Sequence, residues 1–190
     1  LKSENWRQAY WNPVSSGLTP NLFDSKGRVS GVSFDTGVWY MSPYFRKLKD
    51  ADDALMASWC KSRLHTFGGL TPNAKYDLAI YLLHGPPKKG EPKGSHRSIR
   101  VSVLHLEGRN KRKSTPISRQ LINVSTAGTF DDYQVASADN QMRGNVLLLR
   151  AVRADKHGAM SLTIEVGRKK GDQIRWGDTT LAGVQIRSSD

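Results

Sequence analysis

The sequence predicts an all-β fold: an antiparallel β-sandwich of the jelly-roll type with one short helix. Eight or more stretches alternate apolar and polar residues, which is the period of a half-buried strand. Most of the connections between them are turns that contain Gly, Asp or Lys. The 190 residues show no internal repeat and no dividing linker, so residues 1–190 are interpreted as a single domain.

The N-terminal part is expected to be irregular before the first strand begins. Residues 1–21 are aromatic and polar, and we expect them to pack through their aromatic side chains, with at most an edge strand. Residues 24–27, Asp-Ser-Lys-Gly, predict a turn. A strand should follow over 28–34, with a bulge at Gly31 and with these side chains pointing inward: Val29, Val32 and Phe34.

A long loop and the one helix are predicted next. Residues 35–50 combine aromatic and basic side chains without a clear period and are interpreted as a loop. Residues 52–59 predict the helix, about two turns long, because Asp52 and Asp53 suit the positive end of a helix dipole. Residues 61–67 then predict a strand.

The clearest strand follows a turn that contains Pro72 and Asn73. Pro72 fixes φ at the first central position of the turn, and Asn73 tolerates the second. Tyr76 is expected to bury its ring and return its hydroxyl to the backbone, as in the tyrosine corner of β-sandwiches. Both faces of this strand are mostly apolar, so the strand should be central and covered on both sides. One face holds Tyr76, Leu78, Ile80 and Leu82, and the other holds Asp77, Ala79, Tyr81 and Leu83.

The second half of the chain predicts strands separated by loops. Residues 85–94 form a loop rich in Gly and Pro, and residues 108–116 form a basic loop. Alternation predicts strands over 99–105, 117–124, 129–135, 145–152, 160–166 and 181–186.

The charge favours a polyanionic partner. Lys and Arg number 29 against 17 Asp and Glu, a formal net charge of +12. Such a balance suits an acidic polysaccharide, a nucleic acid or an anionic surface, although a basic surface can also serve only solubility. No apolar run is long enough to span a membrane. Cys60 is the only cysteine, so an intrachain disulfide and a Cys-rich zinc site are excluded.

Three segments carry a resemblance to a known family. Residues 67–81 contain the pattern GL-x-P-x-x-x-Y-D-L-x-x-Y, residues 181–186 end in Gln-Ile after a small residue, and residues 24–33 hold a turn and strand. Together they resemble galactose-binding-like β-sandwich domains of large secreted bacterial proteins, over roughly residues 22–187. Fibronectin type III domains share the turn but are about half this length. The resemblance implies a non-catalytic carbohydrate-binding module, sometimes with a structural calcium ion.

Catalytic patterns are absent from the sequence. No nucleophile elbow, P-loop or dinucleotide-binding motif occurs, and the five histidines have no metal-binding spacing. His65 and His105 lie in strand patterns, where a hydrogen-bonded structural histidine is expected. Asp131 and Asp132 are neighbours on a strand and therefore cannot face each other across a sugar. We therefore predict that the chain has no catalytic residues. The alternative is that it is a jelly-roll polysaccharide lyase or glycosidase.

Two sets of residues suit glycan binding, because Trp and Tyr stack on sugar rings while Arg pairs with sulfate or carboxylate groups. If successive loops alternate ends, the loops at 107–116, 136–144 and 168–179 share one end. The first set lies in the first and third of these loops: Trp176, Arg175, Arg109, Lys111, Arg112, Lys113 and Arg168. The alternative set lies in the long loop: Trp39, Tyr40, Tyr44 and Arg46.

We predict that the chain has no cofactor, with a structural calcium ion as an option. Asp24 and Asp35 could supply oxygen ligands, but Asp24 is better explained as a turn former. The N-terminus lacks Met and the apolar core of a signal peptide, as expected of a mature or excised domain. Secreted, periplasmic or cell-surface localisation is expected. Nucleic-acid binding and a structural cell-surface role remain alternatives.

Overall fold

The structure is a computed structural model, and it is all-β in the part that it describes. Antiparallel strands form two sheets, and within the described residues the one helical element is a short 3-10 turn, Ala138–Asn140. The described residues are 12, 17–24, 26–37, 40–43, 58–61, 64–83, 96–105, 116–125, 135–170, 173–178 and 180–189. Within these residues no helix is long and apolar enough to cross a membrane.

The larger sheet has seven strands in the order β1-β2-β5-β10-β7-β8, with β11 also paired to β10. Its strands are β1 (Leu18–Thr19), β2 (Ser33–Asp35), β5 (Leu64–Gly68), β7 (His96–Leu104), β8 (Pro116–Ser125), β10 (Met160–Lys170) and β11 (Gln173–Asp178).

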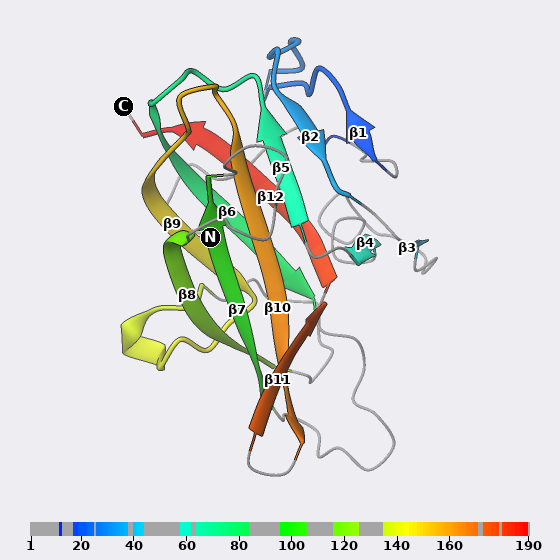
Figure 1. The fold of residues 1–190 in the computed structure, drawn as a ribbon, viewed down its shortest axis with the longest axis vertical. Helices are drawn as coiled ribbons and strands as arrows, with labels where there is room; N and C mark the ends of the chain where they lie inside the picture. Colours follow the sequence, from blue (N-terminus) through cyan, green and yellow to red (C-terminus); the bar gives the residue numbers. More distant parts are fainter. Residues whose placement is uncertain are drawn as a thin grey trace.

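The smaller sheet has five strands in the order β3-β4-β12-β6-β9. Figure 1 shows β6 and β12 running obliquely behind β10 and β5. The strands are β3 (Tyr40–Pro43), β4 (Ser58–Lys61), β6 (Lys75–Leu83), β9 (Val146–Arg153) and β12 (Thr180–Ser188).

One apolar core lies between the two sheets. Inward positions at every second residue of the long strands contribute to it, as the period of two requires. From the larger sheet come Phe34, Phe67, Ile99, Val101, Val103, Ile122, Met160, Leu162, Ile164 and Val166. From the smaller sheet come Leu78, Ile80, Leu82, Leu147, Leu149, Val152 and Leu181. The arrangement is therefore sandwich-like.

The strand at β6 is central and covered on both faces, as predicted. It pairs with β12 on one side and β9 on the other. Leu78, Ile80 and Leu82 are buried in the shared core, and Ala79 and Tyr81 are buried in a second cluster on the outer face. The Tyr81 hydroxyl donates a hydrogen bond of 2.9 Å to Gln185 Oε1 on β12, which satisfies its polar group there.

The turn before β6 is also confirmed. Asn73 has φ 59°, and Ala74 N–H donates to Thr71 O at 3.2 Å. Because Pro72 holds φ negative at the position before it, this combination is a type II turn. Tyr76 packs against the core, and its hydroxyl accepts a 2.8 Å hydrogen bond from Thr71 N–H. The predicted tyrosine corner is therefore present.

The hydrogen bond of the tyrosine corner should contribute measurably to stability. Replacing Tyr76 by phenylalanine keeps the packed ring but removes the acceptor for Thr71 N–H. We expect the free energy of unfolding to fall by about 1 kcal/mol, the usual net value of one such bond. Urea denaturation of the variant beside the parent protein measures this. An unchanged unfolding midpoint would mean that water replaces the hydroxyl at no cost.

Several expectations about the first half of the chain need correction. Ser58 and Trp59, the end of the predicted helix 52–59, lie in strand β4, and the rest of that segment lies outside the described residues. Val29 was expected to point inward, but it is 63% exposed and bridges Phe23. Phe34 is buried as predicted. Residues 35–50 are not all loop, because Tyr40–Pro43 forms β3.

Candidate functional site

The residues proposed from the sequence fall in different places. Arg168 lies on β10 and is the register partner of Arg175 on β11, while Trp176 is the partner of Gly167. The segment 168–179 was expected to be a loop, but most of it forms this β-hairpin. Tyr40 lies in β3 opposite Lys61. The other proposed residues lie outside the described part: Arg109, Lys111, Arg112, Lys113, Trp39, Tyr44 and Arg46.

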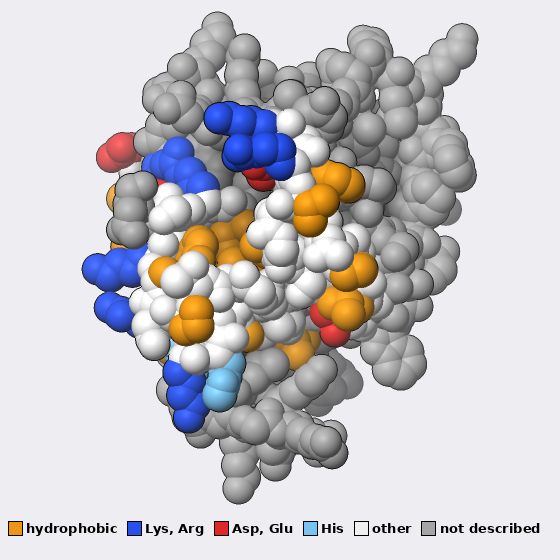
Figure 2. Space-filling view, turned by 90° about the horizontal axis from the view of Figure 1, so that it is seen from above, with side chains coloured by type: hydrophobic (Ala, Val, Ile, Leu, Met, Phe, Trp, Pro, Cys, Tyr) orange, Lys and Arg blue, Asp and Glu red, His pale blue; other side chains and the backbone are white. Residues whose placement is uncertain are grey.

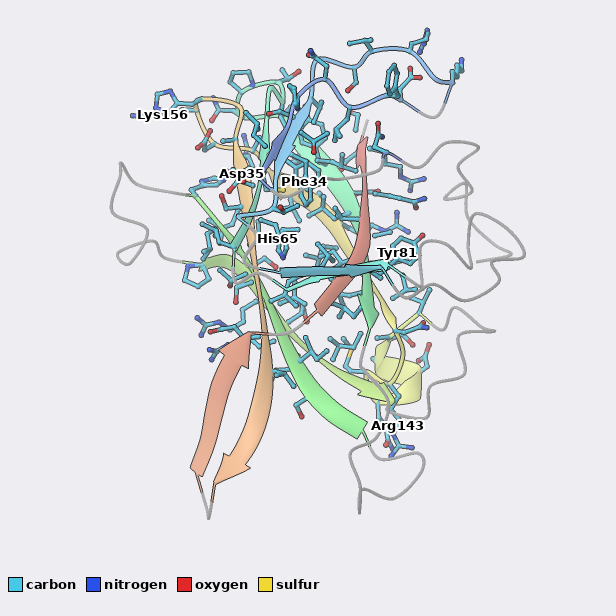
Figure 3. The ribbon with its side chains drawn as sticks, turned by 90° about the vertical axis from the view of Figure 1, so that its right-hand side faces the viewer. Phe34, Asp35, His65, Tyr81, Arg143 and Lys156 are labelled. Carbon is cyan, nitrogen blue, oxygen red and sulfur yellow. The ribbon has the colours of Figure 1, made fainter. Side chains whose placement is uncertain are left out.

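The expectation that the basic loop and the 168–179 segment share one end is wrong. β7 ends at Leu104, which is paired with Ser161 near the start of β10. The hairpin projects from the far end of β10, where Arg168 lies about 23 Å away at ~3.3 Å per residue. Figure 3 shows Arg143 toward the hairpin end and Lys156 toward the other. Among the described residues three strands, β8, β9 and β10, lie between the two segments, whereas the alternation count used four, and an odd number places the segments at opposite ends.

The end opposite the hairpin holds a cluster centred on Asp77, which lies on the outer face of β6. Asp77 Oδ1 accepts hydrogen bonds from Ala151 N–H at 2.9 Å and from Ser189 Oγ–H at 2.8 Å. Its Oδ2 accepts from Arg150 Nη1 at 2.8 Å and from Arg187 Nη2 at 3.2 Å. One carboxylate thus joins the ends of three adjacent strands: β6, β9 and β12.

The Asp77 carboxyl is held in its charged form. Burial by itself would raise its pKa, but the hydrogen bonds from Ala151 N–H, Arg150, Ser189 and Arg187 outweigh that effect. The net result is a pKa well below the usual value of an aspartate. The cluster therefore keeps a fixed negative charge beneath its two guanidinium groups at neutral pH.

A β-bulge brings Arg150 to this carboxylate. Tyr76 pairs with Val152, and Leu78 pairs with Leu149, so two residues of β9 oppose Asp77 alone. Ala151 takes φ +52°, a left-handed conformation that a non-glycine residue adopts at a cost. Its N–H points to Asp77 as a result, and Arg150 lies on the outer face.

Further cations surround the carboxylate. Lys75 and Arg153 are register partners one step along the same outer face, and both are exposed. We call Lys75, Arg150, Arg153 and Arg187 the basic cluster. With Asp77 it has four positive charges and one negative charge, a formal charge of +3. Figure 2, which looks onto this end, shows Lys and Arg side chains around the rim of the described surface.

His105, the last described residue before the predicted basic loop 108–116, contacts this cluster. His105, directly after β7, makes a 2.8 Å hydrogen bond between its Nε2 and Arg153 O. Residues 106–115 lie outside the described part of the chain. The same bond confirms the expectation that His105 is a hydrogen-bonded structural histidine.

No family model, no curated protein and no solved structure matches this chain. The chemistry of its own residues therefore has to support any functional interpretation.

The described carboxylates and histidines do not gather into a metal centre. No three His, Cys, Asp or Glu side chains come together within the described residues. Glu165 is bound by Arg100 at 2.7 Å on the outer face of the larger sheet. His65 is buried in the core and stacks on Phe34, with ring centroids 5.9 Å apart and ring planes 3° apart (Figure 3).

Asp24 acts as a turn former. Its Oδ1 accepts from Lys26 N–H and Arg28 N–H, and its Oδ2 pairs with the Arg28 guanidinium at 2.7 Å. The backbone hydrogen bond from Arg28, followed by the side-chain bond from Arg28, lowers the pKa of Asp24 to about 2. Asp35 Oδ1 likewise accepts from Gly37 N–H. Both carboxylates proposed as calcium ligands are thus engaged in local turns.

Sequence reasoning missed the basic cluster for an identifiable reason. Alternation does place Asp77 and Lys75 on the second face of β6. However, the bulge at Ala151 shifts the period of β9 after Arg150, so alternation does not reveal that Arg153 lies on the same face. The pairing of Arg187 with Asp77 joins residues 110 positions apart, which no local pattern encodes.

Proposed function

We propose that this chain is a non-catalytic carbohydrate-binding module that binds an acidic or sulfated polysaccharide. In this proposal the sandwich-like fold is a jelly roll of the galactose-binding-like type, from a secreted, periplasmic or cell-surface protein. The observation that carries the proposal is the basic cluster, because it gathers four cations on strands rather than on loops. Sites on strands hold their binding groups with little loss of freedom on binding.

The chemistry of the cluster suits a chain of spaced anions. Arg pairs with sulfate and carboxylate groups through its planar donors, while the lysine adds an undirected charge. Arg109, Lys111, Arg112 and Lys113, which follow His105 in the sequence, would add further positive charge for such a ligand. The hairpin residues Arg168, Arg175 and Trp176 would form a separate contact at the opposite end.

A binding role is favoured over hydrolysis by the state of the carboxylates. A glycosidase needs a general acid that keeps its proton near neutral pH, and this requires a raised pKa. The pKa of Asp77 is lowered instead, and Glu165 and Asp24 are each paired with an arginine. Because their pKa values are lowered, Asp77 and Asp24 stay charged near neutral pH and are poorly suited to give a proton to a leaving group.

The test is binding by calorimetry at low salt to chondroitin sulfate, alginate, neutral dextran and duplex DNA. We expect the two acidic glycans to bind and dextran to fail. Replacing both Lys75 and Arg153 by glutamine should weaken glycan binding about tenfold or more, since two charge-assisted contacts are lost. Arg119→Gln, on the exposed face of β8, is the control for removing charge elsewhere.

Three outcomes would contradict the proposal. DNA binding with a steep salt dependence and no glycan binding would indicate a nucleic-acid protein. New reducing or unsaturated ends after incubation with either glycan would indicate an enzyme. Equal losses in Arg119→Gln and in the double variant would mean that only net charge matters. A comparison with Arg168→Gln/Arg175→Gln and Trp176→Ala shows which end makes the contact.

A further inference from the structure

The two arginines of the Asp77 cluster converge on a single atom. Arg150 Nη1 and Arg187 Nη2 bond the same oxygen, Asp77 Oδ2, at 2.8 and 3.2 Å. The two nitrogens therefore lie no more than about 6 Å apart, a gap that one oxyanion can bridge with two N–H···O bonds of about 2.8 Å. Like charges at this distance repel, and the shared carboxylate holds them together.

The positive groups face outward while their shared anion lies beneath them. The side chains of Arg150 and Arg187 are 41% and 37% exposed, whereas the side chain of Asp77 is 11% exposed. Two guanidinium charges over one carboxylate leave a formal charge of +1 at this point, and neighbouring Lys75 and Arg153 have the same sign. A ligand approaching from solvent thus meets the cations first.

The positions of both arginines are fixed by the backbone. Arg187 is the register partner of Asp77, and Arg150 belongs to the bulge in which Ala151 N–H bonds Asp77. Ser189 closes the other side of the carboxylate. Because Asp77 orients both guanidinium groups before any ligand arrives, less side-chain freedom is lost on binding.

We propose that Arg150 and Arg187, oriented by Asp77, form a subsite for one oxyanion group, a sulfate or a carboxylate of a larger ligand. Asp77 is a positioning residue in this subsite, and the two guanidinium groups make the contacts. The identification of that larger ligand as an acidic glycan rests on the proposed function. The capacity of the two arginines to bind the anionic group itself does not depend on the proposed function.

The experiment is an NMR titration of the full chain with sodium sulfate and, separately, with sodium glucuronate, at constant ionic strength set by chloride. We expect saturable shifts of the Ala151 and Ser189 amide signals and of the side-chain Nε–H signals of both arginines. Saturation by sulfate alone, glucuronate alone or both supports the subsite and identifies the group. No saturable shift with either anion overturns the proposal.

Variants establish whether the two arginines act together. Arg187→Gln and Arg150→Gln should each raise the dissociation constant for the bound anion about tenfold or more, as expected on losing a charge-assisted contact. Arg187→Lys keeps the charge and the pairing with Asp77 but loses the planar fork, so it should fold normally and still bind more weakly. It keeps the test valid if the glutamine variants fail to fold.

The Arg119→Gln variant removes the same charge from the other sheet and should change the dissociation constant less than twofold, because no contact is lost. An equal loss in this control overturns the subsite. The two proposals also fail separately. Sulfate saturation without polysaccharide binding leaves the subsite and removes the proposed function. Polysaccharide binding with no response to sulfate or glucuronate leaves the proposed function and removes the subsite.

Discussion

Replacing Gly158 by alanine should lower the free energy of unfolding by about 3 kcal/mol or more, because two separate costs combine. Gly158 has φ +73°, which costs a residue with a Cβ about 1–2 kcal/mol. In addition, a Cβ at this position would overlap with the carbonyl oxygen of Leu70. That carbonyl belongs to the backbone entering the Pro72–Asn73 turn, so it cannot rotate away as a side chain would.

The close approach at Gly158 exists because two turns are joined there. Leu70 N–H donates to Gly158 O at 3.0 Å, and Gly158 N–H donates to Asp155 O at 3.1 Å. Moving either backbone to make room for a methyl group would break these hydrogen bonds and disturb the start of β6. The turn that precedes the central strand is thus held by a second turn some 85 residues later in the chain.

Gly31 provides the matched control. Its φ is +74°, nearly the same as that of Gly158, but a Cβ there would meet no atom within 4 Å. Gly31→Ala should therefore cost only the conformational part, about 1–2 kcal/mol. Urea denaturation of both variants measures the difference. Equal stability of the two variants would show that Leu70 moves aside easily, and the close approach would then have no energetic significance.

Replacing Asp77 by asparagine should lower the free energy of unfolding at pH 7 by about 3 kcal/mol. The value is at the lower end for breaking a buried ion pair, because both arginines retain contact with water. The variant leaves two guanidinium groups close together without the charge that holds them. Asp139→Asn is the control, because it removes one exposed carboxylate from the 3-10 turn. It should change the free energy of unfolding by less than about 0.5 kcal/mol.

The contribution of Asp77 should depend on pH in one direction. Its pKa is lowered in the folded protein, so the folded state holds fewer protons than the unfolded chain at acid pH. The stabilisation is therefore complete above the unfolded pKa of about 4 and decreases as pH falls below that value. The stability gap between parent and Asp77→Asn should narrow between about pH 4 and pH 2. A gap that widens on acidification would contradict this assignment.

Both stability predictions concern residues that lie outside the apolar core. The Asp77 cluster joins the ends of β6, β9 and β12, and Gly158 joins two turns at the same end of the fold. That end also contains the proposed oxyanion subsite. Mutations there can therefore reduce binding through loss of folding, which is why the variants that keep charge or shape are needed alongside the deletions.

Local sequence patterns determined much of the fold. The period of two from Tyr76 to Leu83 predicts a strand buried on both faces, and the structure has both clusters. Pro72 and Asn73 predict the turn, because one fixes φ and the other tolerates a positive φ. Tyr76 predicts the corner hydrogen bond. These features depend on residues within a few positions of one another, so their information is local.

The pairing of distant strands was decided only by the tertiary structure. Residues 168–179 look like a loop because Lys, Arg, Gly and Asp are common there, yet β10 and β11 pair through six register positions. Ser58 and Trp59 follow a helical pattern, yet they join β4 beside β3 and β12. In both cases hydrogen bonding to a neighbouring strand overrides a weak local preference.

The candidate site shows the same division. Net charge and the abundance of arginine, read from the sequence, predict a partner of negative charge. Which cations act together depends on the register of β6 with β9 and β12, on the bulge at Ala151, and on a carboxylate far away in the sequence from both arginines. Strand register is a property of the assembled sheets. The sequence by itself therefore determined the kind of fold and predicted a negatively charged partner, and the tertiary structure decided which cations lie together.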